Sequence, residues 1–145
     1  MDGLVKLVNG ANGILSKFPH MILALMARLI MGSIFLKSGL LKFKDWDNAI
    51  SLFENIFTEV PLPPVVGAYL SGYGEVIFGF CLIVGFASRF SALGILGMTL
   101  VIEIFVFPEE YILHGMWAVC CLYVIKYGPC MLSLDYFVKK QFGNK

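Results

Sequence analysis

The sequence predicts an all-α integral membrane protein: one domain over residues 1–145, built as a four-transmembrane-helix bundle with flanking amphipathic helices at the membrane interface. The 145 residues are 59% hydrophobic and only 14% charged, with a mean hydropathy of +0.82. A soluble domain usually carries about 25% charged residues, and a chain this short leaves about a third of its unfolded surface exposed. Lipid is the simplest solvent for the excess apolar surface. The net charge of +1 gives no indication of a nucleic-acid partner.

Four apolar runs are long enough to cross a bilayer core, which takes about 17–25 helical residues. They cover residues 20–42, 64–86, 90–107 and 111–128. Prolines precede the second run, Ser88-Arg89 separates the second from the third, and Pro108-Glu109-Glu110 separates the third from the fourth. Because so few residues join the second and third runs, we expect these two helices to form an antiparallel hairpin.

Two segments outside these runs repeat apolar residues at the spacing of one helix face, which predicts interfacial helices over residues 3–18 and 45–60. The first carries Leu4, Leu7, Val8, Ala11, Ile14, Leu15 and Phe18. The second carries Trp46, Ala49, Ile50, Phe53, Ile56, Phe57 and Val60, with Asp47, Glu54 and Glu59 on its other face. The second segment is interpreted as a lid over the external end of the bundle, or as a helix that only seals it.

The basic residues outside the spans predict the orientation of the chain. With four crossings, one side of the membrane holds Lys6, Lys17, Arg89, Lys139, Lys140 and Lys145. The opposite side holds Lys44 with Asp45, Asp47, Glu54, Glu59, Glu109 and Glu110. Both termini are therefore expected in the cytoplasm. A cleavable signal peptide is the competing interpretation of the first run, but Arg28 and Lys37 interrupt it and no A-x-A site follows.

Several ionisable residues fall inside the spans or at their edges: Arg28, Lys37, Lys42, Glu75, Glu103, His114 and Lys126. A charge at the bilayer centre costs at least about 2.5–3.5 kcal/mol on insertion scales, so such side chains normally face the bundle interior. At 100° per residue, Arg28 and Lys42 share one helix face, while Lys37 points away from it toward the lipid. Glu75 lies in a stripe of small residues, which let helices approach closely.

The depths of these residues predict a polar seam inside the bundle. Arg28 is expected to pair with Glu75 near the midplane, and Glu103, His114 and Lys42 follow toward the outer leaflet. We interpret Arg28, Lys42 and Glu75 as candidates for binding a lipophilic ligand. Glu103 and His114 are the candidate catalytic proton relay. The alternatives are an Arg28–Glu75 pair that only fixes helix register and a His114 that is a satisfied interfacial histidine.

The composition argues against several kinds of site. The two histidines, His20 and His114, are predicted at opposite ends of their spans, so they do not provide paired ligands for one haem in one subunit. No metal site is expected, and no P-loop or dinucleotide fingerprint is present. The cysteines at positions 81, 120, 121 and 130 are interpreted as apolar packing residues rather than disulfides.

The motifs resemble those of the DoxX family of small bacterial four-span membrane proteins over about residues 20–137. The matching residues are Ala27-Arg28-Leu29, the run from Gly32 to Lys42, Gly74-Glu75, the run from Gly85 to Arg89, Pro108 to Tyr111, His114 to Trp117, and Tyr127-Gly128-Pro129. Two positions depart from the family pattern: Lys37 stands where an apolar or aromatic residue is usual, and Cys130 stands where glycine is frequent.

This resemblance implies a multi-pass protein of the bacterial cytoplasmic (inner) membrane, with membrane lipid and a partner protein or a second copy as neighbours. The family takes its name from a subunit linked to quinone-dependent respiratory and thiosulfate oxidation, and other members look like parts of redox-homeostasis or metal-handling systems. The leading hypothesis is a subunit of a quinone-linked oxidoreductase, with a quinone or another lipophilic molecule in the seam. The alternatives are a non-catalytic membrane scaffold and a proton-coupled small-solute or metal transporter with Glu75 as relay.

Overall fold

The computed structural model describes residues 2–16 and 19–142, and the regular structure in these residues is helical. The elements are α1 (Asp2–Leu15), α2 (His20–Lys44), α3 (Trp46–Asn55), α4 (Pro64–Val84), α5 (Ser88–Phe105), a 3₁₀ turn η1 (Pro108–Glu110), α6 (Tyr111–Tyr127) and α7 (Leu134–Phe142). The predicted all-α class is therefore confirmed. Each predicted span corresponds to one of the helices α2, α4, α5 and α6.

Three of these helices are long and apolar enough to cross a membrane: α2, α4 and α5. The fourth predicted span corresponds to α6, which has 17 residues. At about 1.5 Å per residue it is about 26 Å long, slightly shorter than a hydrocarbon core of about 30 Å. The helix itself is confirmed, and the count of four crossings stays a prediction.

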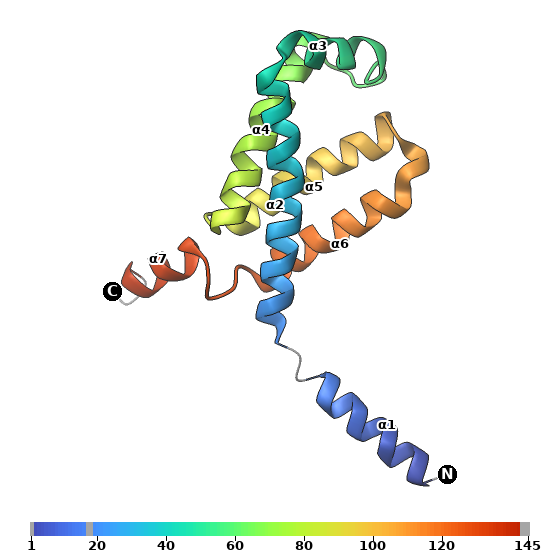
Figure 1. The fold of residues 1–145 in the computed structure, drawn as a ribbon, viewed down its shortest axis with the longest axis vertical. Coiled ribbons are helices and arrows are strands. Elements are labelled where there is room, and N and C mark those ends of the chain that lie inside the picture. The colour runs from blue at the N-terminus through green and yellow to red at the C-terminus, as the bar shows by residue number, and fades with distance from the viewer. Residues whose placement is uncertain (1, 17–18, 143–145) are drawn as a thin grey trace.

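The centre of the fold is the antiparallel pair α2 and α4, which lie side by side along their lengths (Figure 1). Glycines permit this contact. A Cβ atom added at Gly79 would lie 2.7 Å from the backbone nitrogen of Leu36, and one at Gly39 would lie 2.9 Å from that of Val76. The predicted stripe of small residues on α4 therefore faces α2. Close approach of this kind is how helices associate in lipid, where the hydrophobic effect gives no drive.

A second antiparallel pair, α5 and α6, packs obliquely against the first (Figure 1). The short loop between α4 and α5 joins these two helices in the predicted hairpin. Gly85 ends α4 with φ 75°, a left-handed conformation that suits glycine, and α5 starts at Ser88. The shared core contains Ala27, Met31, Phe35, Leu82, Ala92, Ile95, Cys121 and Val124.

Helix α3 covers one end of the α2–α4 pair (Figure 1). Asp45 starts it by accepting a hydrogen bond from the Asn48 N–H at 2.9 Å. Phe53 packs over Gly67, where an added Cβ would lie 2.5 Å from the ring. The predicted lid is thus present, but the helix ends at Asn55 rather than residue 60. Turns and bends follow through Leu62, in a stretch where Pro61 and Pro63 disfavour helical backbone at the residues before them.

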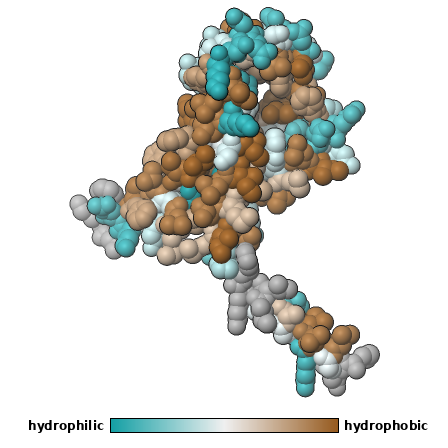
Figure 2. Space-filling view, viewed as in Figure 1, coloured by the Kyte–Doolittle hydropathy of each residue, from teal (hydrophilic) through white to brown (hydrophobic). Residues whose placement is uncertain are grey.

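The two terminal helices lie outside the bundle. Helix α1 extends away from it and exposes Leu4 and Leu7 at 67% and 72% (Figure 1). Its placement at the membrane interface stays a prediction, and Lys17, Phe18 and Lys145 lie outside the described residues. Helix α7 was not predicted. Figure 2 shows apolar residues over the sides of the bundle and hydrophilic residues gathered around α3, as expected for a molecule embedded in lipid.

Candidate functional site

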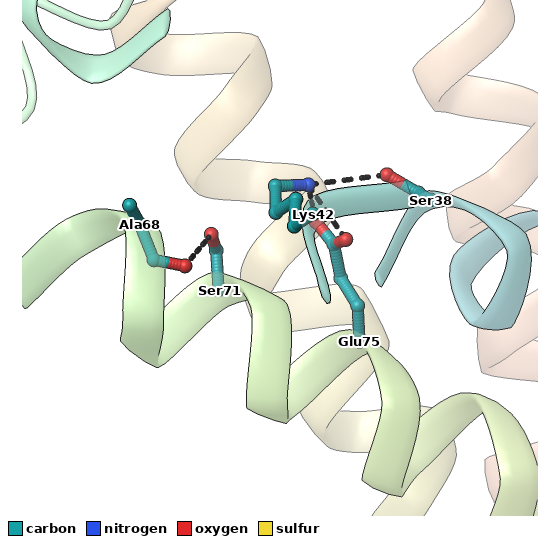
Figure 3. A network of polar contacts seen from close by, with 5 residues as sticks. All are labelled: Ser38, Lys42, Ala68, Ser71 and Glu75. Carbon is teal, nitrogen blue, oxygen red and sulfur yellow. Dashed lines mark hydrogen bonds and ion pairs between the residues drawn. The ribbon is translucent and has the colours of Figure 1, made fainter. Parts of the chain in front are cut away.

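A buried ion pair joins the end of α2 to the middle of α4. The Lys42 Nζ lies 2.7 Å from Glu75 Oε2 and 2.9 Å from Oε1, and it donates to Ser38 Oγ at 3.2 Å (Figure 3). The two charged side chains are only 12% and 7% exposed. One ammonium therefore neutralises both carboxylate oxygens where water is scarce, which is the condition under which a buried charge is tolerated.

The neighbouring helix surface fits around this pair. Gly72 and Gly39 leave room for it, since side chains there would meet Trp46 and the backbone of Val76. One turn before Glu75, the Ser71 hydroxyl donates to the Ala68 carbonyl at 3.0 Å (Figure 3). The Ser71 oxygen keeps free lone pairs that can accept a further hydrogen bond.

Lys42, Ser71 and Glu75 line a cavity of about 360 Å³ between α4 and α5, with α3 and the loop after it on one side. The other lining residues are apolar: Phe53, Phe57, Val60, Leu62, Gly67, Leu70, Leu93, Gly94, Gly97, Met98, Val101, Ile102 and Val106. Ligand cavities in proteins are typically about 300–1,000 Å³, mainly apolar, with a few placed polar groups. This cavity has that composition and lies at the lower end of that size range.

The cavity borders the outer surface of the bundle. Leu70 and Leu93, which line it from α4 and α5, are 63% and 55% exposed. An apolar molecule can therefore reach it from the side, along the surface that faces lipid. Gly97 lies at the same wall, and a Cβ atom added there would meet nothing within 4 Å. Gly97 is exposed, so a larger side chain at this position has room at the edge of the cavity.

A second polar pair joins α5 to α6. The Nδ1 atom of His114 lies 2.6 Å from Glu103 Oε2, and the side chains are 6% and 23% exposed. The His114 ring also lies 5.2 Å from that of Trp117, which contacts Phe35 at 5.7 Å between centroids. The predicted proximity of Glu103 and His114 is confirmed. Neither residue lines the cavity, although Ile102, next to Glu103, does.

The predicted pairing of Arg28 with Glu75 is wrong. Arg28 is 1% exposed and donates from Nε to the Leu82 carbonyl at 3.0 Å and from Nη2 to that of Ile83 at 3.0 Å. Its Nη1 atom donates to the Leu132 carbonyl at 3.1 Å and to Cys130 Sγ at 3.3 Å. Arg28 therefore binds the last turn of α4, whose carbonyls lack helical partners and favour a cation.

The register of the two helices explains this correction. Glu75 lies opposite Gly39, where an added Cβ would approach the Glu75 Cβ to 3.0 Å. Arg28 precedes Gly39 by eleven residues, about 16 Å along α2 at 1.5 Å per residue. Lys42 is only three residues away from Gly39, so it is the cation that reaches Glu75.

The single seam predicted from the sequence is thus divided into three separate sites. Within residues 2–16 and 19–142, no hydrogen bond joins the Lys42–Glu75 pair to the Glu103–His114 pair or to Arg28. The sequence analysis did not identify Ser38 as a hydrogen-bond acceptor for Lys42, although Ser38 lies one helical turn before Lys42 on the same face. It also missed the cavity wall supplied by α3, because packing of α3 on α4 leaves no periodic signal.

Comparison with known proteins identifies a family for the chain. The model of the DoxX family matches residues 23–108, more than half of the chain. That stretch contains Arg28, Lys42, Glu75 and Glu103, while His114 lies beyond it. No curated protein and no solved structure matches.

Proposed function

We propose that this chain, which belongs to the DoxX family of membrane proteins, is the membrane subunit of a redox assembly and binds a quinone-type molecule in the cavity between α4 and α5. One observation carries the proposal: a cavity with an apolar wall, bordering the lipid-facing surface, has the buried Lys42–Glu75 pair in its lining. A quinone combines the matching features, a flat apolar ring with carbonyl oxygens and a long apolar tail.

The lining residues suggest how such a ligand would lie. Its ring would pack against Met98 and Phe57, and its tail would leave between Leu70 and Leu93. The Lys42 ammonium would donate a hydrogen bond to one carbonyl oxygen, at the cost of a weaker contact with Ser38 or one oxygen of Glu75. Charge-assisted hydrogen bonds of this kind are short and strong in a dry site.

A bound quinone would supply two-electron, two-proton chemistry, with the electrons delivered by a partner protein of the assembly. The residues of this chain would hold the changing head group. Lys42 would stabilise negative charge on a carbonyl oxygen, and the Glu75 carboxylate or the Ser71 oxygen would accept a hydrogen bond from a quinol hydroxyl.

The Glu103–His114 pair would exchange protons with water in this proposal. Glu103 is the more exposed member, at 23%, and its Oε2 atom lies 2.6 Å from Nδ1 of the buried His114. A pair arranged in this way can pass a proton between an exposed and a buried position. Ile102, the residue before Glu103, lines the ligand cavity, so the Glu103–His114 pair lies next to that cavity along α5.

The setting of this function is the bacterial inner membrane, crossed four times, with both termini in the cytoplasm. The asymmetry of charges supports this orientation. Arg89 and Lys139 lie at one end of the bundle. Glu109 and Glu110 lie at the other end, in the turn that joins α5 to α6. A partner protein or a second copy of the chain would complete the assembly.

The proposal is tested by the quinone that copurifies with the protein. Full-length protein is extracted in a mild detergent, its lipids are removed with organic solvent, and quinones are quantified by chromatography with mass detection. The Gly97→Leu variant adds a side chain to the cavity lining without a clash at its Cβ, and it should retain at least tenfold less quinone. The matched control is Gly115→Leu, on α6, where the added Cβ also meets nothing and which lies outside the cavity.

Two outcomes oppose each other in this experiment. Quinone in the wild type and in Gly115→Leu but not in Gly97→Leu supports the proposal. Equal amounts in all three proteins, or no quinone together with no rise in the thermal midpoint on addition of a short-chain quinone, contradicts it and favours the scaffold hypothesis.

A further inference from the structure

A second cavity, of about 510 Å³, lies at the end of the bundle that carries α7, opposite α3. Its wall comes from the start of α5, the end of α6 and α7: Ala87, Ser88, Arg89, Phe90, Tyr127, Gly128, Pro129, Asp135, Tyr136 and Lys139. We propose that this cavity binds the phosphate group of an anionic phospholipid. It is separate from the quinone cavity, with which it shares no lining residue.

The charge of the wall favours an anion. Arg89 and Lys139 line the cavity, and neither forms an ion pair with another described residue. The one acidic group, Asp135, is already engaged: its two oxygens accept from the N–H groups of Ala87 and Ser88 at 2.7 and 2.8 Å. The Asp135 carboxylate accepts hydrogen bonds from the N–H groups at the start of α5. With two basic side chains and one acidic side chain in the wall, the net charge of the cavity is positive, which suits a phosphodiester of charge −1.

A buried hydroxyl in the same wall lacks a partner. Ser88 is 0% exposed, and its Oγ atom makes no hydrogen bond with any described residue. Buried polar groups in proteins are nearly always hydrogen-bonded, so such an atom calls for an explanation. Ser88 lines the cavity, and in this proposal a phosphate oxygen there is the acceptor of its hydroxyl.

The Arg89 side chain lies beside the end of α6. A Cβ atom added at Gly128 would lie 3.1 Å from its Nη2 atom and 3.2 Å from its Nε atom, so the guanidinium packs over this glycine. Gly128 has φ 75°, a conformation that side chains rarely adopt. The planar guanidinium therefore lies at the cavity wall, where it can bind a phosphate with two parallel hydrogen bonds.

The surroundings point to a lipid as the source of the phosphate. Phe90, which follows Arg89 in the wall, is 77% exposed, and Tyr127 is 51% exposed. An occupant with a phosphate in the cavity and an acyl chain along Phe90 would satisfy both kinds of surface. Basic cavities and exposed aromatic rings at the ends of membrane helices are typical of the headgroup region.

The proposal is tested by native mass spectrometry of the full-length protein in a neutral detergent. The probes are dioleoyl phosphatidylglycerol, dioleoyl phosphatidylcholine and inorganic phosphate. We expect phosphatidylglycerol to bind at least fivefold more tightly than phosphatidylcholine. Arg89→Gln and Lys139→Gln should each weaken it about fivefold, which corresponds to about 1 kcal/mol per cation. The matched control is Lys37→Gln, which removes an exposed lysine from α2 outside the cavity.

The outcomes separate the sources of the anion. Selective loss of phosphatidylglycerol in both variants but not in Lys37→Gln supports a lipid headgroup. Inorganic phosphate that binds as well as the lipid, with the same dependence on Arg89, retains a phosphate site but assigns it to a free anion. Equal lipid binding by the wild type and both variants, or equal binding of the two lipids, overturns the proposal. Lys139→Gln lies on the exposed surface of α7 and keeps the test valid if Arg89→Gln fails to fold.

Discussion

Each of the charged side chains buried in this bundle is stabilised by a different kind of partner. Lys42 and Glu75 neutralise one another. Arg28 has carbonyl and thiol acceptors instead of a carboxylate. The stability of the folded protein depends on these partners. If one partner is removed, the remaining buried charge has neither its partner nor water around it.

The first prediction concerns the Lys42–Glu75 pair. Lys42→Met alone leaves a carboxylate without its cation and should lower the free energy of unfolding by about 3–5 kcal/mol. The double variant Lys42→Met/Glu75→Leu removes both charges and should recover most of that loss. Reversible unfolding in detergent, arranged as a double-mutant cycle, measures the coupling. Strictly additive effects would show that the two residues do not interact in the folded protein.

A second prediction concerns Arg28, which joins the end of α4 to the segment before α7. Lys cannot reproduce the planar fork that reaches the carbonyls of Leu82, Ile83 and Leu132. We expect Arg28→Lys to lower the free energy of unfolding by about 3 kcal/mol, the contribution of one or two hydrogen bonds from a charged group. The C-terminal segment should also become more sensitive to protease. The control is Arg89→Lys, an exposed arginine, whose stability should stay close to that of the wild type.

At the level of elements, the close contact of α2 and α4 depends on glycine. Gly79→Ala would place a Cβ 2.7 Å from the Leu36 backbone nitrogen, and backbone atoms cannot rotate away. Overpacking of this kind costs about 1–3 kcal/mol. Thermal unfolding in detergent should show a lower midpoint for Gly79→Ala and an unchanged or higher one for Gly115→Ala, where the space is open. A Gly79→Ala protein as stable as the wild type would contradict this packing.

The sequence was sufficient to predict the helices because their signals are local. The predicted spans agree with α2, α4, α5 and α6 within two residues at every end, and the helical period of the small residues on α4 predicts their stripe. The pairing of charges was not predictable in the same way. Arg28 and Lys42 lie on one face of α2, so only the register of α4 against α2 decides which of them meets Glu75.

Other features depend on contacts that the sequence does not encode locally. Three of the four acceptors of Arg28 are backbone carbonyls, which every residue carries, so no residue type marks them. Helix α7 has only nine residues, so the helical spacing of Leu134, Phe137 and Val138 is a short signal, and the start of the helix is fixed by contacts with residues far away in the chain. Asp135 binds the N–H groups of Ala87 and Ser88, and its own N–H donates to the Gly85 carbonyl at 2.9 Å.

At the scale of the whole molecule, the number of crossings decides where the termini lie. Single cysteines at Arg89, Glu110 and Lys140, placed in a variant without the native cysteines, can be labelled with a membrane-impermeant maleimide. With four crossings, Glu110→Cys should react from the side opposite to Arg89→Cys and Lys140→Cys. Labelling of Glu110→Cys and Lys140→Cys from the same side would show that α6 does not cross the membrane.

The cavities near α3 and near α7 have different neighbours. The one near α3 has an apolar wall and one ion pair, and it adjoins exposed leucines of α4 and α5. The one near α7 has tyrosines and two cations that form no ion pair within residues 2–16 and 19–142. In the account proposed above, the first holds a lipophilic redox molecule and the second fixes the protein to the lipid headgroups.

The most direct test of the first assignment is to locate the ligand by cross-linking. Full-length protein is illuminated with a quinone that carries a photoreactive azide, and the labelled peptides are identified by mass spectrometry. The account predicts labels within residues 57–62 and 93–106, suppressed by excess unmodified quinone and by Gly97→Leu. Labels confined to α6 and α7, or labels that excess quinone does not suppress, would contradict it.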